Sequence, residues 1–493
     1  PVAAANRGLT PPARQQPAAP PPTEPPPKPI DMTARSIEAE VLRCGEELVL
    51  DHLWAEGSPI DDSGRSVEVR QEPAKKGERG IYIQGNSLDM RCYPDGNILN
   101  VSGDLAQLMM DKIHIIGPDI HIDQTSNEAS VKGEGAMQME SNQTLDGKQL
   151  TEPQPLIVHW SEFMVFSGDH AEFDGGIQAT QKNARLACQH LQVFFDRPIS
   201  LKEGSRGDQP AKVRSLVGDK NVRVEDKVVD KRGKLEKYQL LSGISINMET
   251  VPRDDDDDGR SSASPTGTGK GKEGSKSNDA NDVTLSGPGS ARLMQYGGSD
   301  LTTTPTRPAP NQRTAAKQAP GEQVMKLTYI RFEKLMKASS RTNTARFWGN
   351  VNVLNFPCEE KDEHRDDLDT MLITGLPLGA MHLRCEWLKV RSYQKKERDP
   401  RDPNKVIEKS YQEMEAHGRV TAQGKEFFAQ CDHMTFNEEK DQVIFIGDNG
   451  RPAVLERRFV KGGKPDVIHG RKITYIRSTG KASADEIDGI DVR

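Results

Sequence analysis

The alternation of apolar and polar residues along this chain changes phase at recurring places. In the stretch LACQHLQVFFD (residues 186–196), Leu186 and Cys188 alternate with polar residues. Leu191, Val193 and Phe195 form a second alternation that is out of phase with the first by one residue. A straight strand would turn one of these sets away from the core. A bend just after Cys188 would keep both sets on one interior face.

The same phase change recurs, and the position just before it is always Gly or Cys. Gly permits unusual backbone angles and the close approach of a neighbour, and Cys is a small residue that is often buried. We therefore predict a bend of the strand at each of these positions. The predicted bend positions are Gly85, Gly117, Gly168, Cys188, Gly243, Cys385, Cys431 and Gly470.

Most of the remaining sequence has a period of two and is rich in Val, Ile, Thr and Phe, which is typical of β-strands. Few stretches keep a helical apolar pattern, although residues 33–54 could begin as a helix or form strand and loop. Stacked units of this bent kind would share a continuous interior. The sequence thus predicts an all-β protein of β-jellyroll or β-solenoid stacks.

Two low-complexity segments divide the chain. Residues 1–31 are Pro-rich, and residues 252–322 combine an acidic run with Ser, Gly and Pro. Such segments bury too little apolar surface to offset their ordering entropy, so we expect a disordered lead and a disordered linker. The predicted β-repeat regions are therefore residues 32–251 and 323–493, joined by a flexible tether.

Composition excludes several classes of protein. The 493 residues are 34% hydrophobic and 29% charged, with a net charge of -7, which gives no general attraction to nucleic acid. The six cysteines form no C-x-x-C pair, which argues against a zinc ribbon or a thioredoxin-type site. No apolar run approaches the roughly 20 residues that span a bilayer. No signal peptide is recognisable in the residues given.

No arrangement of residues indicates catalysis. The chain has no G-x-S-x-G and no H-E-x-x-H motif, so we predict a non-enzyme with no catalytic residues and no cofactor. The stretch GTGKGKEGSK (267–276) lacks the Gly-Lys-Ser/Thr ending of a phosphate loop. The run 254–258 of aspartates has no EF-hand spacing and is interpreted as a solvated linker.

One histidine-rich stretch could suggest a metal site. KIHIIGPDIHID (112–123) holds His114, Asp119, His121 and Asp123 close together. On a strand, His121 and Asp123 share the face opposite the apolar isoleucines, which indicates a solvated outer face. The same interpretation applies to the cluster around His170, and no metal is predicted.

The longest copy of the bent pattern carries a family resemblance. Residues 417–448 contain G-x-V-x-A, then A-x-C-x-x-M-x-F-N, then D-x-V-x-F-x-G. This resembles the repeat of the OstA/LptA-like family, the organic-solvent-tolerance fold. FWGNVNVLNF with MHLRCEWLKV resembles a second unit, with an insertion from Pro357 to Gly379, and residues 101–135 resemble a third. The chain departs from the family in using Gly or Cys where the family favours Ala, and in its long acidic linker.

The resemblance implies a β-taco, a folded-over sheet with an apolar groove. It also implies a role in carrying lipopolysaccharide across the periplasm of a two-membrane bacterium, end-to-end stacking of copies or partner proteins, and no catalytic residues. The groove would use interior residues, whose alternative role is a closed, packed core. These lipid-groove candidates are Ile120, Ile122, Ala171, Phe173, Leu191, Val193, Leu388, Val390, Met434 and Phe436.

Three functions remain open at this point. The first is a non-enzymatic envelope protein that binds or passes on a lipopolysaccharide-like lipid. The second is a structural scaffold with a filled core, and the third is a carbohydrate-active enzyme, which would need carboxylates converging in a cleft. A disulfide between Cys385 and Cys431 is a further alternative to two buried thiols, because neighbouring strands lie about 4.8 Å apart.

Overall fold

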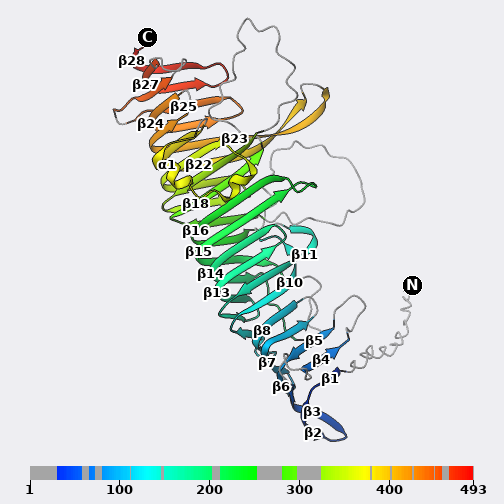
Figure 1. The fold of residues 1–493 in the computed structure, drawn as a ribbon. Helices are drawn as coiled ribbons and strands as arrows, with labels where there is room; N and C mark the ends of the chain where they lie inside the picture. The colour runs from blue at the N-terminus through cyan, green and yellow to red at the C-terminus, as the bar shows by residue number, and fades with distance from the viewer. Residues whose placement is uncertain are drawn as a thin grey trace, which may run out of the picture.

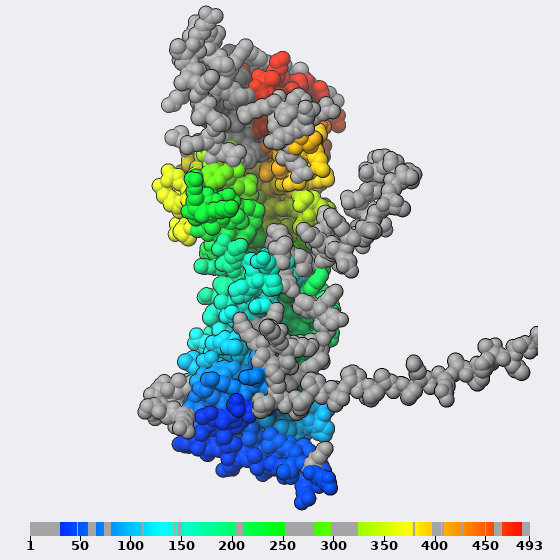
Figure 2. All heavy atoms as spheres, turned by 90° about the vertical axis from the view of Figure 1, so that its right-hand side faces the viewer, coloured from blue at the N-terminus to red at the C-terminus, as the bar shows by residue number. Residues whose placement is uncertain are grey.

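The computed structural model describes residues 30–57, 66–72, 80–110, 113–145, 149–202, 211–251, 280–296, 324–377, 380–399, 402–424, 427–448, 450–457 and 466–491. Over these residues 28 strands join into one sheet, with one short α-helix and one short 3-10 helix, so the all-β prediction is confirmed. The strands stack into a long, narrow molecule with β2 and β3 at one end and β27 and β28 at the other (Figures 1 and 2).

The strands of the first half are β1 (Ile30–Thr33), β2 (Ser36–Cys44), β3 (Glu47–Glu56), β4 (Val67–Gln71), β5 (Ile81–Gly85), β6 (Ser87–Tyr93), β7 (Gly96–Met110), β8 (Ile113–Asp123), β9 (Glu128–Lys132), β10 (Gly135–Gln143), β11 (Gln149–Trp160), β12 (Phe163–Phe166), β13 (His170–Gln181) and β14 (Ala184–Phe195). The second half contains β15 (Val213–Val229), β16 (Leu235–Val251), β17 (Ala280–Ser286), β18 (Gly289–Tyr296), β19 (Met325–Phe332), β20 (Leu335–Ser339), β21 (Thr344–Pro357), a 3-10 helix (Glu360–His364), α1 (Leu368–Thr374), β22 (Met381–Asp399), β23 (Asp402–Gln423), β24 (Phe427–Asn437), β25 (Gln442–Ile446), β26 (Ala453–Arg457), β27 (Asp466–Ile476) and β28 (Lys481–Asp491).

A line of bends divides the sheet into two facing halves. Half-sheet A contains β1, β4, β5, β10, β11, β18, β19 and β26, and half-sheet B contains β2, β3, β6, β9, β12, β17, β20 and β25. The longer strands cross the bend and pair in both halves. In β13, for example, residues 171–174 pair with β12 in half-sheet B, and residues 177–181 pair with β14 in half-sheet A.

Bulged strands alternate with strands that carry a small residue at the bend. In β13, Gly175 and Gly176 both have positive φ and together oppose one residue of β14, next to the buried Cys188. Such a two-against-one bulge bends and twists the strand. The residue pairs 220–221 in β15, 349–350 in β21 and 418–419 in β23 repeat this geometry. Each pair opposes one residue, which is the neighbour in sequence of Gly243, Cys385 and Cys431 respectively.

The structure places most of the predicted bend positions on this line. Those at the bend are Gly85, Gly117, Cys188, Gly243, Cys385, Cys431 and Gly470. The prediction for Gly168 is wrong, because this residue lies in the turn between β12 and β13, where Phe166 pairs with Ala171. A hairpin turn changes the phase of the alternation as a bend does, so the pattern could not separate the two.

Side chains from the two half-sheets meet across the interior. The rings of Trp160 in half-sheet A and Phe173 in half-sheet B lie 5.5 Å apart between centroids, and those of Phe332 and Phe347 lie 5.8 Å apart. All four side chains are buried. Because burying a large apolar side chain contributes about 1.5–3 kcal/mol, these contacts hold the two halves together.

The expected division into two stacks with a tether is wrong. Residues 280–296, inside the expected linker, form β17 and β18, which pair with β16 on one side and with β19 and β20 on the other. The stack is therefore continuous. Residues 33–54 lie mostly in β2 and β3, and β1 begins at Ile30, inside the expected lead. The glycine-rich stretch 267–276 and the aspartate run 254–258 lie outside the described residues.

The close packing at Gly117 gives a prediction for stability. A Cβ atom on Gly117 would collide with Cγ1 of Val131. We expect Gly117→Ala to destabilise the protein by about 1–3 kcal/mol through overpacking. In a double-mutant cycle measured by urea unfolding, Val131→Ala should relieve at least about 0.5 kcal/mol of this cost. Strictly additive effects would contradict the packing explanation.

The cysteines at the bend give a second prediction. Cys385 and Cys431 are free and buried, and burial raises the pKa of each thiol to about 12. We expect iodoacetamide at neutral pH to modify the exposed Cys44 in the folded protein and to leave Cys385 and Cys431 unmodified until denaturant is added. Mass mapping without reductant provides the check, and a peptide pair linked through Cys385 and Cys431 would contradict the structure.

Candidate functional site

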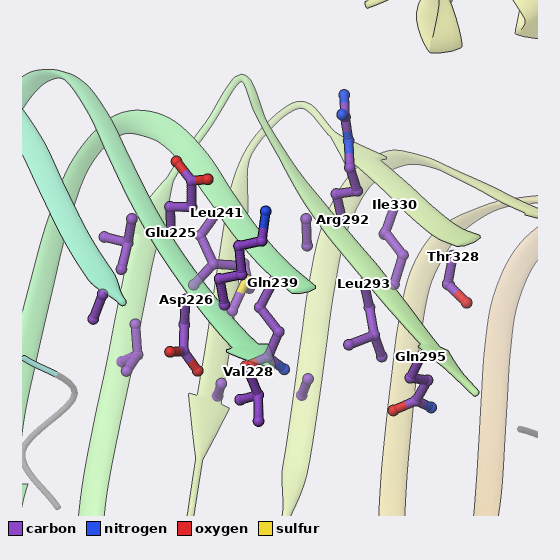
Figure 3. A pocket seen from close by; sticks show the side chains of 18 of the residues that line it. Glu225, Asp226, Val228, Gln239, Leu241, Arg292, Leu293, Gln295, Thr328 and Ile330 are labelled. Atoms are coloured by element: carbon purple, nitrogen blue, oxygen red, sulfur yellow. The ribbon is translucent and has the colours of Figure 1, made fainter. Parts of the chain in front are cut away.

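An open groove lies between the two half-sheets in the second half of the stack. Its cavity volume is about 750 Å³. Its lining comes mainly from β15, β16, β18, β19, β21 and β22, with fewer side chains from β17, β20, β23, β24, β11 and the turn between β13 and β14. Ligand pockets typically have volumes of about 300–1,000 Å³. Figure 3 shows part of half-sheet A as it faces this groove.

The groove is apolar near the bend and polar toward its mouth. On three strands of half-sheet A an inward-facing apolar residue is followed, two positions farther from the bend, by a polar one (Figure 3). These pairs are Leu241 and Gln239 on β16, Leu293 and Gln295 on β18, and Ile330 and Thr328 on β19. Because every second residue of a strand faces inward, the change from apolar to polar among these inward residues produces the gradient.

Half-sheet B covers the groove from the opposite side with apolar side chains. They include Met248, Val283, Met336, Ala338, Ala345, Met414 and Phe436. Methionine is unbranched and polarizable, so it adapts to apolar partners of varied shape. Val283, with Leu293 of half-sheet A, lies within the segment expected as linker. The alternation in NDVTLS and SARLMQY was the signal that could have identified both strands.

The predicted groove residues divide into two groups. Leu388, Val390 and Phe436 line the groove. Six of the others pack in the core outside it: Ile120, Ile122, Phe173, Leu191, Val193 and Met434. Ala171 is also buried there. In the first half of the stack, side chains therefore fill the space between the two half-sheets. Ile120 and Phe173 are examples, because each is only 1% exposed.

A second hydrophobic core covers the outer face of half-sheet A beside the groove. Tyr238, Leu327 and Leu354 are fully buried there, and Leu368 and Met371 of α1 pack among them. The insertion predicted between β21 and β22 thus covers the back of β16, β18, β19 and β21. Near the bend these strands therefore carry apolar side chains on both faces, as Leu240 and Leu241 of β16 illustrate.

Polar contacts fix this insertion to the sheet. Lys227 Nζ donates to the Glu363 carboxylate at 2.8 Å, and Arg292 donates to the backbone oxygens of Glu363 and Arg365 at 2.6 Å. Tyr329 donates to Asp369 at 2.8 Å, and burial together with this carboxylate raises the pKa of Tyr329 to about 12. Figure 3 shows Arg292 projecting away from the groove.

Two lysines lie at the mouth of the groove. Lys182 is in the exposed turn between β13 and β14, and Lys326 is the first inward residue at the outer end of β19. Asp226 lies on the same rim. The rim therefore offers ammonium groups next to an apolar interior, a combination suited to an amphipathic anion.

The histidine-rich stretch of β8 lies apart from the groove. Ile120 and Ile122 point into the core, and His121 Nδ1 donates to Asn100 Oδ1 at 2.6 Å. The backbone N–H and hydroxyl of Thr125 donate to Asp123, and these bonds lower the pKa of that carboxyl to about 2. His170 Nδ1 lies 2.9 Å from Asp169. Each of these groups has a local partner within its own strand, turn or hairpin.

No helix in the described part of the chain has the length and apolar character needed to cross a membrane. A scan against models of protein families finds no match to this chain. A search among curated proteins likewise finds no matching relative. The groove and its surroundings are therefore interpreted from their own geometry.

Proposed function

We propose that this protein is a non-enzymatic carrier that holds or passes on an amphipathic, lipopolysaccharide-like lipid. The observation that carries the proposal is the open groove of about 750 Å³, with an apolar base and a polar, partly cationic mouth. The place of action would be the periplasm, between the inner and outer membranes of a two-membrane bacterium. The resemblance to the OstA/LptA-like family supports this, because it implies a folded-over sheet with such a groove.

The binding mechanism would be burial of acyl chains. Each methylene group that moves from water into the groove contributes about 0.8 kcal/mol. Leu241, Ile330 and Met414 would surround the chains, while Lys182 and Lys326 would meet the anionic head group. Binding would be spread over many individually weak contacts, which together hold the lipid.

The two ends of the stack offer edges through which one molecule could contact the next during lipid transfer. In the described residues, β2 pairs only with β3, and β28 pairs only with β27. Each end therefore presents an unpaired strand edge, which can add a strand of another copy or of a different envelope protein. Such end-to-end stacking would join the sheets of successive molecules into one longer stack.

A structural scaffold remains the second candidate. The observation in its favour is the interior of the first half of the stack, where packed side chains fill the space between the half-sheets. A scaffold would need only this packing and would not use the groove. Lipid binding therefore separates the two candidates.

Blocking the groove tests the carrier function. Ala338 of β20 lines the groove, and the neighbouring Lys337 is exposed on the opposite face. We expect Ala338→Trp to weaken lipopolysaccharide binding by about ten-fold or more, equal to about 1.4 kcal/mol, because the indole ring occupies acyl-chain space. Lys337→Trp is the matched control and should bind as the wild type does. Displacement of a fluorescent acyl probe measures both affinities.

Native mass spectrometry of the purified wild type provides the independent check. A co-purified or added amphipathic lipid should remain bound in the wild type and in Lys337→Trp. A wild-type protein that neither retains such a lipid nor binds added lipopolysaccharide would exclude the carrier function and leave the scaffold. Equal binding by Ala338→Trp would show that the lipid uses another surface.

A further inference from the structure

Two histidines and a glutamate meet on the outer face of half-sheet B. Glu415 and His417 are two residues apart on β23 and share the face opposite the groove-lining Met414. His433 of β24 stands directly opposite His417 in the strand register. The three residues thus come from two adjacent strands, and their side chains converge beside the bend.

The distances within this cluster are close to those of a metal coordination shell. Oε1 of Glu415 lies 2.9 Å from Nε2 of His417 and 3.8 Å from Nε2 of His433. One candidate ligand atom from each residue lies within 4.8 Å of the others. Zinc–ligand bonds of about 2.0–2.2 Å place neighbouring donors of a tetrahedral shell roughly 3.3 Å apart. Small rotations of the side chains would therefore reach this geometry.

The surroundings leave the ligand atoms directed toward one another. Lys389 Nζ approaches Oε2 of Glu415 at 3.5 Å, so Oε1 remains on the side of the histidines. The rings of His417 and His433 stack at 3.9 Å, and Trp387 packs against His417 at 4.8 Å. Nε2 of His433 is buried and has no hydrogen-bond partner. A ligand for this nitrogen would satisfy a polar atom that the fold leaves without one.

We propose that Glu415, His417 and His433 bind a divalent transition-metal ion of the Zn²⁺ class. Two imidazole nitrogens and one carboxylate oxygen suit Zn²⁺, Ni²⁺ or Cu²⁺ and are a poor set for Ca²⁺ or Mg²⁺, which require mainly oxygen ligands. With three protein ligands, a fourth position stays open to water. The ion would connect β23 to β24 and stabilise the folded state by mass action.

A similar cluster elsewhere in the stack supplies a matched control. His190 of β14 lies 3.6 Å from Glu172 and 3.9 Å from Asp174, on the pair of strands that bends at Cys188. Asp174 stands opposite His190 just as His417 stands opposite His433. This control site has one imidazole in place of two, so it should bind the ion far more weakly.

A zinc titration of the full chain tests the proposal. The protein is first treated with a chelator to remove bound metal, and the chelator is then removed. Wild type and His190→Gln should each bind one Zn²⁺ in competition with a chromophoric chelator. His433→Gln and Glu415→Gln should bind Zn²⁺ at least about ten-fold more weakly than the wild type. Even the loss of a residue that only hydrogen-bonds a metal ligand lowers the metal affinity by about 10–100-fold. Zinc should also raise the unfolding temperature of the wild type, and this increase should disappear in the two ligand variants.

Several results would overturn the metal site. One is a wild-type chain that takes up no stoichiometric Zn²⁺, and another is His433→Gln binding as tightly as His190→Gln. Circular dichroism of the metal-free variants establishes that they fold. If His433→Gln does not fold, Glu415→Gln decides, because the amide keeps the shape of the carboxylate and one of its two acceptor oxygens while it removes the charge. Co²⁺ gives a second readout, since its visible absorption bands should appear with the wild type and be absent with Glu415→Gln.

Discussion

The fold depends on one geometric constraint at the bend. Both arms of each strand must present apolar side chains to the same interior, so the strand has to change phase where it turns. Bulged strands achieve this with two residues against one, as at Gly175 and Gly176. Beside the bulge, the partner strand carries a small, buried residue, as at Cys188. Where a Cβ atom would collide, as at Gly117, glycine is required.

The second core explains how an open groove can persist in a stable stack. Beside the groove, the interior contacts between the half-sheets are incomplete, and each missing side-chain contact forgoes burial worth about 1.5–3 kcal/mol per large residue. Tyr238, Leu327 and Leu354 are instead buried on the outer face, beneath α1 and the 3-10 helix. Apolar burial there holds β16, β19 and β21 in place, so the groove side does not have to close.

The groove and the cluster of Glu415, His417 and His433 lie on opposite faces of β23 and β24. On β23, Met414 faces the proposed lipid site, while Glu415 and His417 face outward. On β24, Phe436 lines the groove, and His433 joins the cluster. An ion bound outside would fix the register of the two strands whose inner side chains form part of the groove. The two proposals use different surfaces, and failure of one leaves the other intact.

The period-two pattern and its phase changes at Gly or Cys determined the all-β class and most bends, because both are local properties of a strand. The same pattern could not separate the turn at Gly168 from a bend, since each reverses the alternation. Only the tertiary structure decided that Ile120 is packed while Val390 lines a groove, because this depends on the distance between the half-sheets. It also brought His433 to His417, which lies sixteen positions away in sequence and becomes its neighbour only through the register of β23 and β24.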